Sequence, residues 1–176
     1  KEKEEMWPHV WQMACREEEI PEPGDHHVYW IIDRSVIVTR TPSGEIKGYI
    51  NSCRHRGRCL RDESGSVDKF RCPFHGATWD LEGQFQGIPN QWDFEHIKSR
   101  DMSLPQVKVA TWGGFVFINF DQDAPPLEDY MEVLPDHFKR FPLEEYFTGV
   151  HVQRVMNCNW KVGAEAFMES WHTVET

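Results

Sequence analysis

The chain has 176 residues, of which 39% are apolar and eight are tryptophans, so it can bury a substantial hydrophobic core. Its net charge is −10, whereas proteins that bind nucleic acid usually present a basic face, so we expect no nucleic-acid partner. No apolar stretch approaches the roughly 20 residues that cross a bilayer, the charged N-terminus lacks an apolar signal core, and five cysteines are an odd number for disulfide staples. We therefore expect no membrane partner and a reducing, cytoplasmic location.

The N-terminal part of the chain predicts one helix followed by three strands. Residues 6–20 carry apolar side chains at a nearly helical spacing, which predicts a helix, and the turn residues PEPGD at 21–25 end it. Residues 27–33, 35–41 and 45–52 are rich in β-branched and aromatic residues and are separated by turn residues. These three segments predict antiparallel strands.

The rest of the chain predicts further strands and then helices. Alternating apolar residues or glycine turns predict strands in residues 77–85, 104–121 and 146–160. Helical spacing predicts one or two short helices in residues 127–141, broken by Pro135, and a final helix in residues 161–174.

Two short clusters of metal-binding residue types lie among the expected strands. Cys53-x-His55 is followed, after sixteen residues, by Cys72-x-x-His75. Cysteine and histidine bind either zinc or an iron–sulfur cluster. Zinc fingers usually pair Cys with Cys and His with His, whereas each cluster here pairs one Cys with one His. A Rieske [2Fe-2S] centre has two Cys on one iron and two His on the other, so the mixed pairs favour it over a zinc-binding interaction module.

The residues that follow each His refine this interpretation. Gly57 and Gly76 allow tight turns that bring backbone N–H groups toward the sulfurs. Respiratory-chain Rieske subunits carry a serine and a tyrosine after the second His, at the positions of Ala77 and Trp79. Ala77 and Trp79 have no hydroxyl to donate a hydrogen bond to the cluster. We therefore expect a reduction potential at the low end of the Rieske range, roughly −150 mV rather than +300 mV.

Four arginines crowd the first cluster of this otherwise acidic chain: Arg54, Arg56, Arg58 and Arg61. They indicate either local salt bridges or a basic docking patch for an acidic electron donor.

A second motif lies near the end of the sequence. Asn159-Trp160-Lys161 is followed by Glu165-Ala166-Phe167-x-Glu169-x-Trp171-His172. With the Cys/His clusters, this motif resembles the large (α) subunit of Rieske non-haem iron oxygenases, the ring-hydroxylating oxygenase family. The catalytic domain of that family opens with Asn-Trp-Lys, then Glu-Asn-Phe-x-Asp/Glu-x-Tyr-His. Ala166 and Trp171 depart from this pattern.

The resemblance implies an α+β fold, with a mainly antiparallel β Rieske domain followed by the start of an α+β catalytic domain of helix-grip type. We expect a helical N-terminal segment that packs on the catalytic domain at residues 1–25 and the Rieske domain at residues 26–122. The incomplete catalytic domain is expected at residues 123–176, after the change of composition at DQDAPP. On the family's spacing the remaining iron ligands lie beyond Thr176, so we expect the N-terminal part of a longer chain.

The resemblance also implies roles for six residues. The [2Fe-2S] cluster would be held by Cys53, His55, Cys72 and His75. His172 would be the first ligand of a mononuclear Fe(II). Glu169 takes the place of a carboxylate that links His75 of one subunit to the iron site of its neighbour. Residues 169 and 172 are three apart, so one helix face can present both.

As an activity, the resemblance implies the terminal component of a mono- or dioxygenase that uses O₂ to hydroxylate a small organic substrate, most commonly an aromatic compound. NAD(P)H would supply electrons through a separate reductase, directly or through a ferredoxin, and the assembly would be a homotrimer or an α3β3 oligomer. The alternative is a stand-alone Rieske-type electron-transfer protein, against which the second motif argues.

Overall fold

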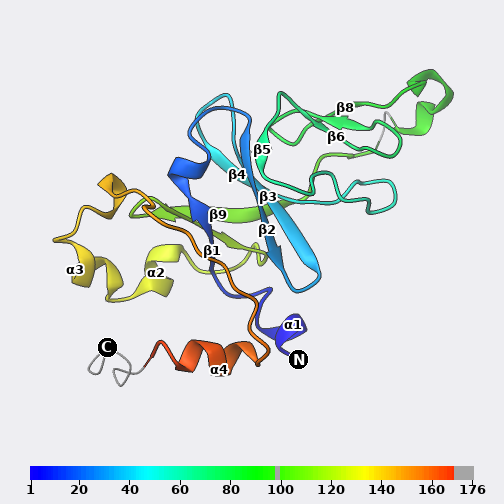
Figure 1. Ribbon diagram of the computed structural model, residues 1–176. Coiled ribbons are helices and arrows are strands. Elements are labelled where there is room, and N and C mark those ends of the chain that lie inside the picture. Colours follow the sequence, from blue (N-terminus) through cyan, green and yellow to red (C-terminus); the bar gives the residue numbers. More distant parts are fainter. Residues whose placement is uncertain (98–99, 169–176) are drawn as a thin grey trace.

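The structure is a computed structural model that describes residues 1–97 and 100–168 (Figure 1). Two antiparallel sheets make up most of it. The larger sheet has the order β1-β10-β9-β4-β3-β2-β5, and the smaller has the order β6-β7-β8. Figure 1 shows the small sheet, labelled at β6 and β8, at the end of the molecule away from α2, α3 and α4.

The strands and helices have the following bounds. The large sheet contains β1 (Gln12–Arg16), β2 (Asp25–Ile31), β3 (Arg34–Arg40), β4 (Ile46–Ile50), β5 (Gly65–Ser66), β9 (Gln106–Trp112) and β10 (Phe115–Asn119). The small sheet contains β6 (Phe70–Arg71), β7 (Thr78–Trp79) and β8 (Phe85–Gly87). The α-helices are α1 (Glu2–Glu5), α2 (Leu127–Met131), α3 (Leu134–Phe138) and α4 (Trp160–Glu165). The mainly antiparallel β fold is therefore confirmed, as are the strands expected between residues 27 and 52 and on either side of the Gly113-Gly114 turn.

Strand β3 separates two hydrophobic cores. Successive side chains of a strand point to opposite faces, and Val36, Ile37 and Val38 are all fully buried. Ile37 packs in a core with Cys53, Cys72 and Trp79, whereas Val36 and Val38 pack in a core with residues of β1, β9 and β10. Both faces of this central strand are covered, which gives the first of these cores a rigid support.

The helix expected over residues 6–20 is wrong, because this segment contains the strand β1. Strand β1 pairs with β10, and its register shifts between Met13 and Cys15. The irregularity lets Ala14 and Cys15 both be buried while Met13 is exposed. A bulge of this kind breaks the period of two that marks a strand, so the apolar spacing imitates a helix.

The C-terminal part of the described chain differs from expectation in two further respects. Of the one or two short helices expected in residues 127–141, two are present, α2 and α3. The break expected at Pro135 is wrong, because Pro135 lies in the first turn of α3, where proline is tolerated. The strand expected over residues 146–160 is wrong, since no described strand lies there. Val152 and Val155 are exposed, and no described strand pairs with this segment. Every described helix is too short, or too polar, to cross a bilayer.

Trp79 anchors the small sheet, and its removal gives a test of the fold. Its side chain is fully buried, its ring lies 5.9 Å from that of Phe85, and its indole N–H donates to the Met102 carbonyl at 2.7 Å. We expect Trp79→Ala to lower the free energy of unfolding by about 3–5 kcal/mol. Trp92 is 71% exposed, so Trp92→Ala should change that energy by less than about 0.5 kcal/mol. Equal urea midpoints for the two variants would contradict this account.

Candidate metal centre

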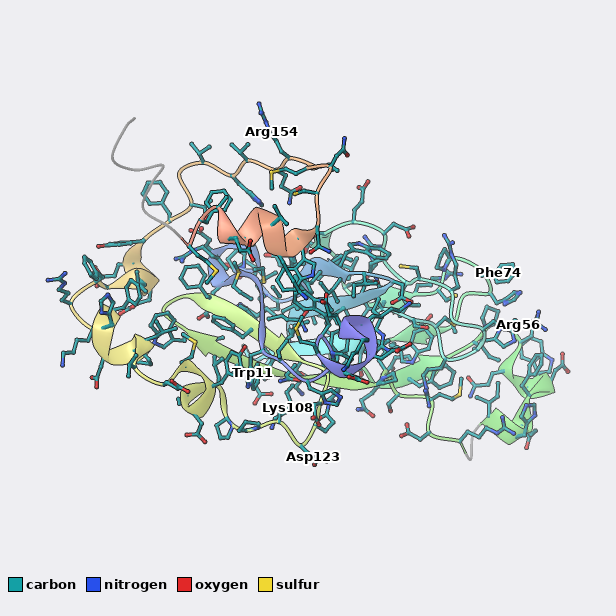
Figure 2. The ribbon with its side chains drawn as sticks, turned by 90° about the horizontal axis from the view of Figure 1, so that it is seen from below. Trp11, Arg56, Phe74, Lys108, Asp123 and Arg154 are labelled. Atoms are coloured by element: carbon teal, nitrogen blue, oxygen red, sulfur yellow. The ribbon has the colours of Figure 1, made fainter. Side chains whose placement is uncertain are left out.

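The two Cys/His clusters lie on two loops at the same end of the molecule. The first loop, residues 53–58, follows β4, and the second, residues 72–77, connects β6 to β7. Figure 2 labels Arg56 of the first loop and Phe74 of the second, and both project at the same end of the molecule. The fold therefore brings together two sequence motifs that are sixteen residues apart.

Both loops close with the same backbone hydrogen bonds. The N–H groups of Cys53 and Cys72 each donate to the carbonyl five residues later, at 2.8 Å in both loops. Gly57 donates back to the Cys53 carbonyl at 2.9 Å, and Gly76 donates to the Cys72 carbonyl at 3.0 Å. The φ angles of these glycines are 72° and 76°, a conformation that costs a residue with a Cβ but not glycine. Each loop is therefore a tight turn with its cysteine at the base.

The two cysteines meet inside the protein. Cys53 is 5% exposed and Cys72 is 2% exposed, and both belong to the core that contains Trp79. Burial is the main cause that raises the pKa of the Cys53 thiol; a backbone hydrogen bond from His55 opposes it, and the neighbouring Cys72 thiol raises it further. The thiolate of Cys53 in this apolar site therefore needs a nearby cation to compensate its charge.

The two histidines meet at the surface. The Nδ1 atoms of His55 and His75 lie 3.3 Å apart, and both side chains are exposed. Because the Nδ1 atoms face each other, the Nε2 atoms lie on the outer sides of the rings. The ring of Phe74 stacks on that of His75, with centroids 3.9 Å apart and an interplanar angle of 26°, which restricts the orientation of this imidazole.

The donor atoms fit a group with two metal ions. Two thiols lie together and two imidazoles lie together, which matches a [2Fe-2S] cluster with Cys₂ on one iron and His₂ on the other. A structural zinc ion would instead need four donors arranged around one point. Within residues 1–97 and 100–168, no three His, Cys, Asp or Glu side chains form such a single-ion group.

The arginines around the first loop have different surroundings. Arg58 lies 3.7 Å from Asp62, and the Nε–H of Arg61 donates to His26. Arg54 and Arg56 are exposed, and the part of the chain that the structure describes forms no ion pair with either. Local contacts thus involve Arg58 and Arg61, and Arg54, after the hydrogen bonds from Ser103, helps to lower the pKa of Asp101. A docking role for Arg54 and Arg56 stays a prediction.

Three further residues complete the comparison with the sequence-based expectations. Glu169 and His172 lie outside the described residues. Asn51 gives no sequence signal beyond being an amide at the end of an apolar strand, yet the structure buries it beside the first loop.

An antiparallel β domain with two matched Cys/His loops at one end is the arrangement that a Rieske centre needs. A family model described as Rieske [2Fe-2S] domain matches residues 10–108, so the chain belongs to the Rieske [2Fe-2S] domain family. The matched range includes β1. The domain boundaries that we expect near residues 26 and 123 stay predictions.

Curated relatives are α subunits of aromatic-ring dioxygenases. The chain is 32% identical to chlorobenzene dioxygenase subunit alpha of Cupriavidus sp. (strain PS12), over 99% of this chain and 40% of that protein. It is 31% identical to the large oxygenase component of the naphthalene 1,2-dioxygenase system of Pseudomonas putida, over 92% of this chain and 38% of that protein. The chain thus spans about two fifths of the length of these relatives.

Solved structures of two Rieske oxygenases are similar to this chain. The quaternary ammonium Rieske monooxygenase CntA in complex with L-carnitine has a TM-score of 0.87 and 26% identity, over 97% of this chain and 49% of that chain. Naphthalene 1,2-dioxygenase with indole bound in the active site has a TM-score of 0.73 and 31% identity, over 78% of this chain and 32% of that chain.

The surroundings of the second loop support a low reduction potential. The indole N–H of Trp79 donates to Met102, so it is not directed at the loops, and Ala77 has no polar side-chain atom. We expect a midpoint potential of roughly −150 mV, measured by redox titration followed by EPR. Ala77→Ser adds a hydroxyl beside the loop and should raise the potential, because hydrogen bonds to the sulfurs favour the reduced cluster. A clearly positive potential for the unmodified protein would contradict this prediction.

Proposed function

We propose that the chain is the N-terminal part of the terminal component of a Rieske non-haem iron oxygenase. The observation that carries the proposal is that the likeness to oxygenases continues beyond the Rieske match at residues 10–108. It extends over 99% of the chain for a dioxygenase α subunit and 97% for a monooxygenase structure. A stand-alone electron carrier, the alternative, needs only the cluster domain.

We propose that Cys53 and Cys72 hold one iron of a [2Fe-2S] cluster and that His55 and His75 hold the other through Nδ1. The buried thiol pair and the facing Nδ1 atoms support this assignment. When bound, the cluster supplies one-electron transfer. The core around the cysteines keeps water from the sulfurs. Each imidazole bound through Nδ1 keeps its proton on Nε2, which can donate to a carboxylate on a partner surface.

The Asn-Trp-Lys motif has a structural role that supports the second part of the proposal. Asn159 is the N-cap of α4, and its Oδ1 accepts a hydrogen bond from the Lys161 N–H at 3.0 Å, which stabilises the first turn. The Trp160 indole N–H donates to Glu2 at 3.0 Å, and Lys161 forms an ion pair with Glu2. The motif thus both starts α4 and attaches it to the N-terminal segment.

We propose that Glu169 is the bridging carboxylate and that His172 is a ligand of a mononuclear Fe(II). Their roles rest on the resemblance of the motif. A solved structure of a quaternary ammonium Rieske monooxygenase, 28% identical over 79% of this chain, is described as giving insights into inter-subunit electron transfer. This description supports electron transfer between subunits. The route that we propose, from His75 of one subunit to Glu169 of the next in a homotrimer or α3β3 assembly, rests on the resemblance.

The substrate class that we propose is a small aromatic compound, oxidised with O₂ and with electrons from NAD(P)H through a reductase, directly or through a ferredoxin. The curated relatives at 31–32% identity are named for chlorobenzene, biphenyl and naphthalene. CntA, whose solved complexes contain L-carnitine and γ-butyrobetaine, is 26% identical, so a quaternary amine is the second substrate class to screen.

Metal analysis of the full-length protein tests the proposed function. We expect about three irons and two acid-labile sulfides per chain, from the cluster and the mononuclear site, on a chain whose intact mass is well above 20.8 kDa. About two irons and two sulfides would indicate an electron carrier and contradict the oxygenase proposal. A colourless protein that contains zinc would contradict both parts of it.

Substitution of Glu169 tests the bridging role. Glu169→Gln keeps the size of the side chain and removes its charge, so we expect both metals to be retained and product formation to fall by about 10–100-fold. Glu128→Gln, on the exposed side of α2, is the matched control and should leave turnover unchanged. Near-normal product formation by Glu169→Gln would rule out the bridging carboxylate.

A further inference from the structure

The two ligand loops are held at their bases in different ways. The second loop is the tip of a hairpin, and its base is fixed by the pairs Phe70 with Trp79 and Arg71 with Thr78. The first loop lacks this support, because it leaves β4 and leads to β5, which pairs with β2 and not with β4. Backbone hydrogen bonds close the turn of residues 53–58 itself, but the residues on either side of it, 51 and 60–61, need another interaction to hold them together.

The side chain of Asn51 supplies that interaction. It is 5% exposed and makes four hydrogen bonds. Its Nδ2 group donates to the Arg61 carbonyl at 2.6 Å and to the Ser35 hydroxyl at 3.1 Å. Its Oδ1 atom accepts from the backbone N–H groups of Leu60 and Arg61, both at 3.0 Å. All donor and acceptor positions of the amide are thus in use, and they join residue 51 to residues 60–61 and to β3.

A second contact fixes the far end of the loop to the sheet. Arg61 donates through Nε to the Nε2 atom of His26 at 3.2 Å, and His26 is buried on β2. Leu60, the neighbour of Arg61, is buried in the core that contains Cys53 and Cys72. The segment that Asn51 closes is therefore anchored on both β2 and β3.

We propose that Asn51 is a positioning residue for the iron–sulfur site: its amide sets where the first loop, with Cys53 and His55, stands relative to the second. The inference rests on the proposed [2Fe-2S] cluster. Outer groups that orient metal ligands commonly change metal retention by 10–100-fold when they are replaced. Asn51 orients the first loop as a whole. The pairing of β6 with β7 does the same for the second loop.

The decisive variant is Asn51→Asp in the full-length holoprotein. Aspartate has the same shape and keeps the acceptor for the Leu60 and Arg61 N–H groups, but its second oxygen cannot donate to the Arg61 carbonyl. We expect the end of the loop to move, the EPR g values of the dithionite-reduced cluster to shift or broaden, and the cluster to be lost to an iron chelator about 10–100-fold faster.

The matched control is Asn119→Asp. Asn119 is also completely buried, lies on β10 away from both loops, donates to the His9 carbonyl at 3.4 Å and accepts from the Asp121 N–H at 2.9 Å. Its substitution should reduce overall stability without moving the EPR spectrum or the rate of cluster loss. A positioning role thus differs from a general loss of stability in these two measurements.

Three outcomes decide the inference. A changed EPR spectrum and faster cluster loss in Asn51→Asp, but not in Asn119→Asp, would support it. An unchanged spectrum and rate in Asn51→Asp would overturn the inference and leave the proposed function intact, whereas a wild-type protein without any cluster signal would overturn both. If Asn51→Asp does not fold, Ser35→Ala is the second variant, because it removes one of the four hydrogen bonds of Asn51. It should change the EPR spectrum and the rate of cluster loss in the same direction but by less. No change in either measurement would overturn the inference.

Discussion

The contact between Cys53 and Cys72 is the interaction on which the rest of the site depends. Both side chains are part of the hydrophobic core beneath the loops, together with Phe70 and Trp79. Each cysteine lies at the base of its loop, and both loops are closed by the same backbone hydrogen bonds. When the two bases pack against each other in the core, the tips of both loops stay at the surface. His55 and His75 lie on those tips, so the thiol pair is shielded from water while the imidazole pair is exposed to a partner.

The support for this contact comes from the order of the strands. Strand β3 is the central element, and its alternating side chains fill one core beneath the ligand loops and another against β1, β9 and β10. The small sheet supplies the second loop as a hairpin, while the first loop depends on hydrogen bonds from a buried amide. The proposed [2Fe-2S] site is therefore supported by strand pairing at the second loop and by the hydrogen bonds of Asn51 at the first.

Much of the fold and the chemical character of the site could be predicted from the sequence. The strands β2, β3 and β4 have strong β-branched patterns, and the mixed Cys/His spacing indicates the metal group directly. The segment around Met13 could not be predicted, because a bulge alters its alternation. Residues 146–160 have strand-like alternation but no described neighbour to pair with, and a strand needs a neighbour to satisfy its backbone groups. The role of Asn51 could not be predicted, because its partners Ser35, Leu60 and Arg61 have no sequence pattern that links them to it and are brought to its side chain only by folding.

The measurement that tests the central claim most directly is pulsed EPR of the reduced full-length protein. If Cys53 and Cys72 bind one iron and His55 and His75 bind the other, the spectrum should show strong hyperfine coupling to two imidazole nitrogens. His75→Cys, which replaces one of these nitrogens with sulfur, should remove one coupling and keep the other. A paramagnetic cluster without nitrogen coupling, or a spectrum that His75→Cys does not alter, would contradict the ligand assignment.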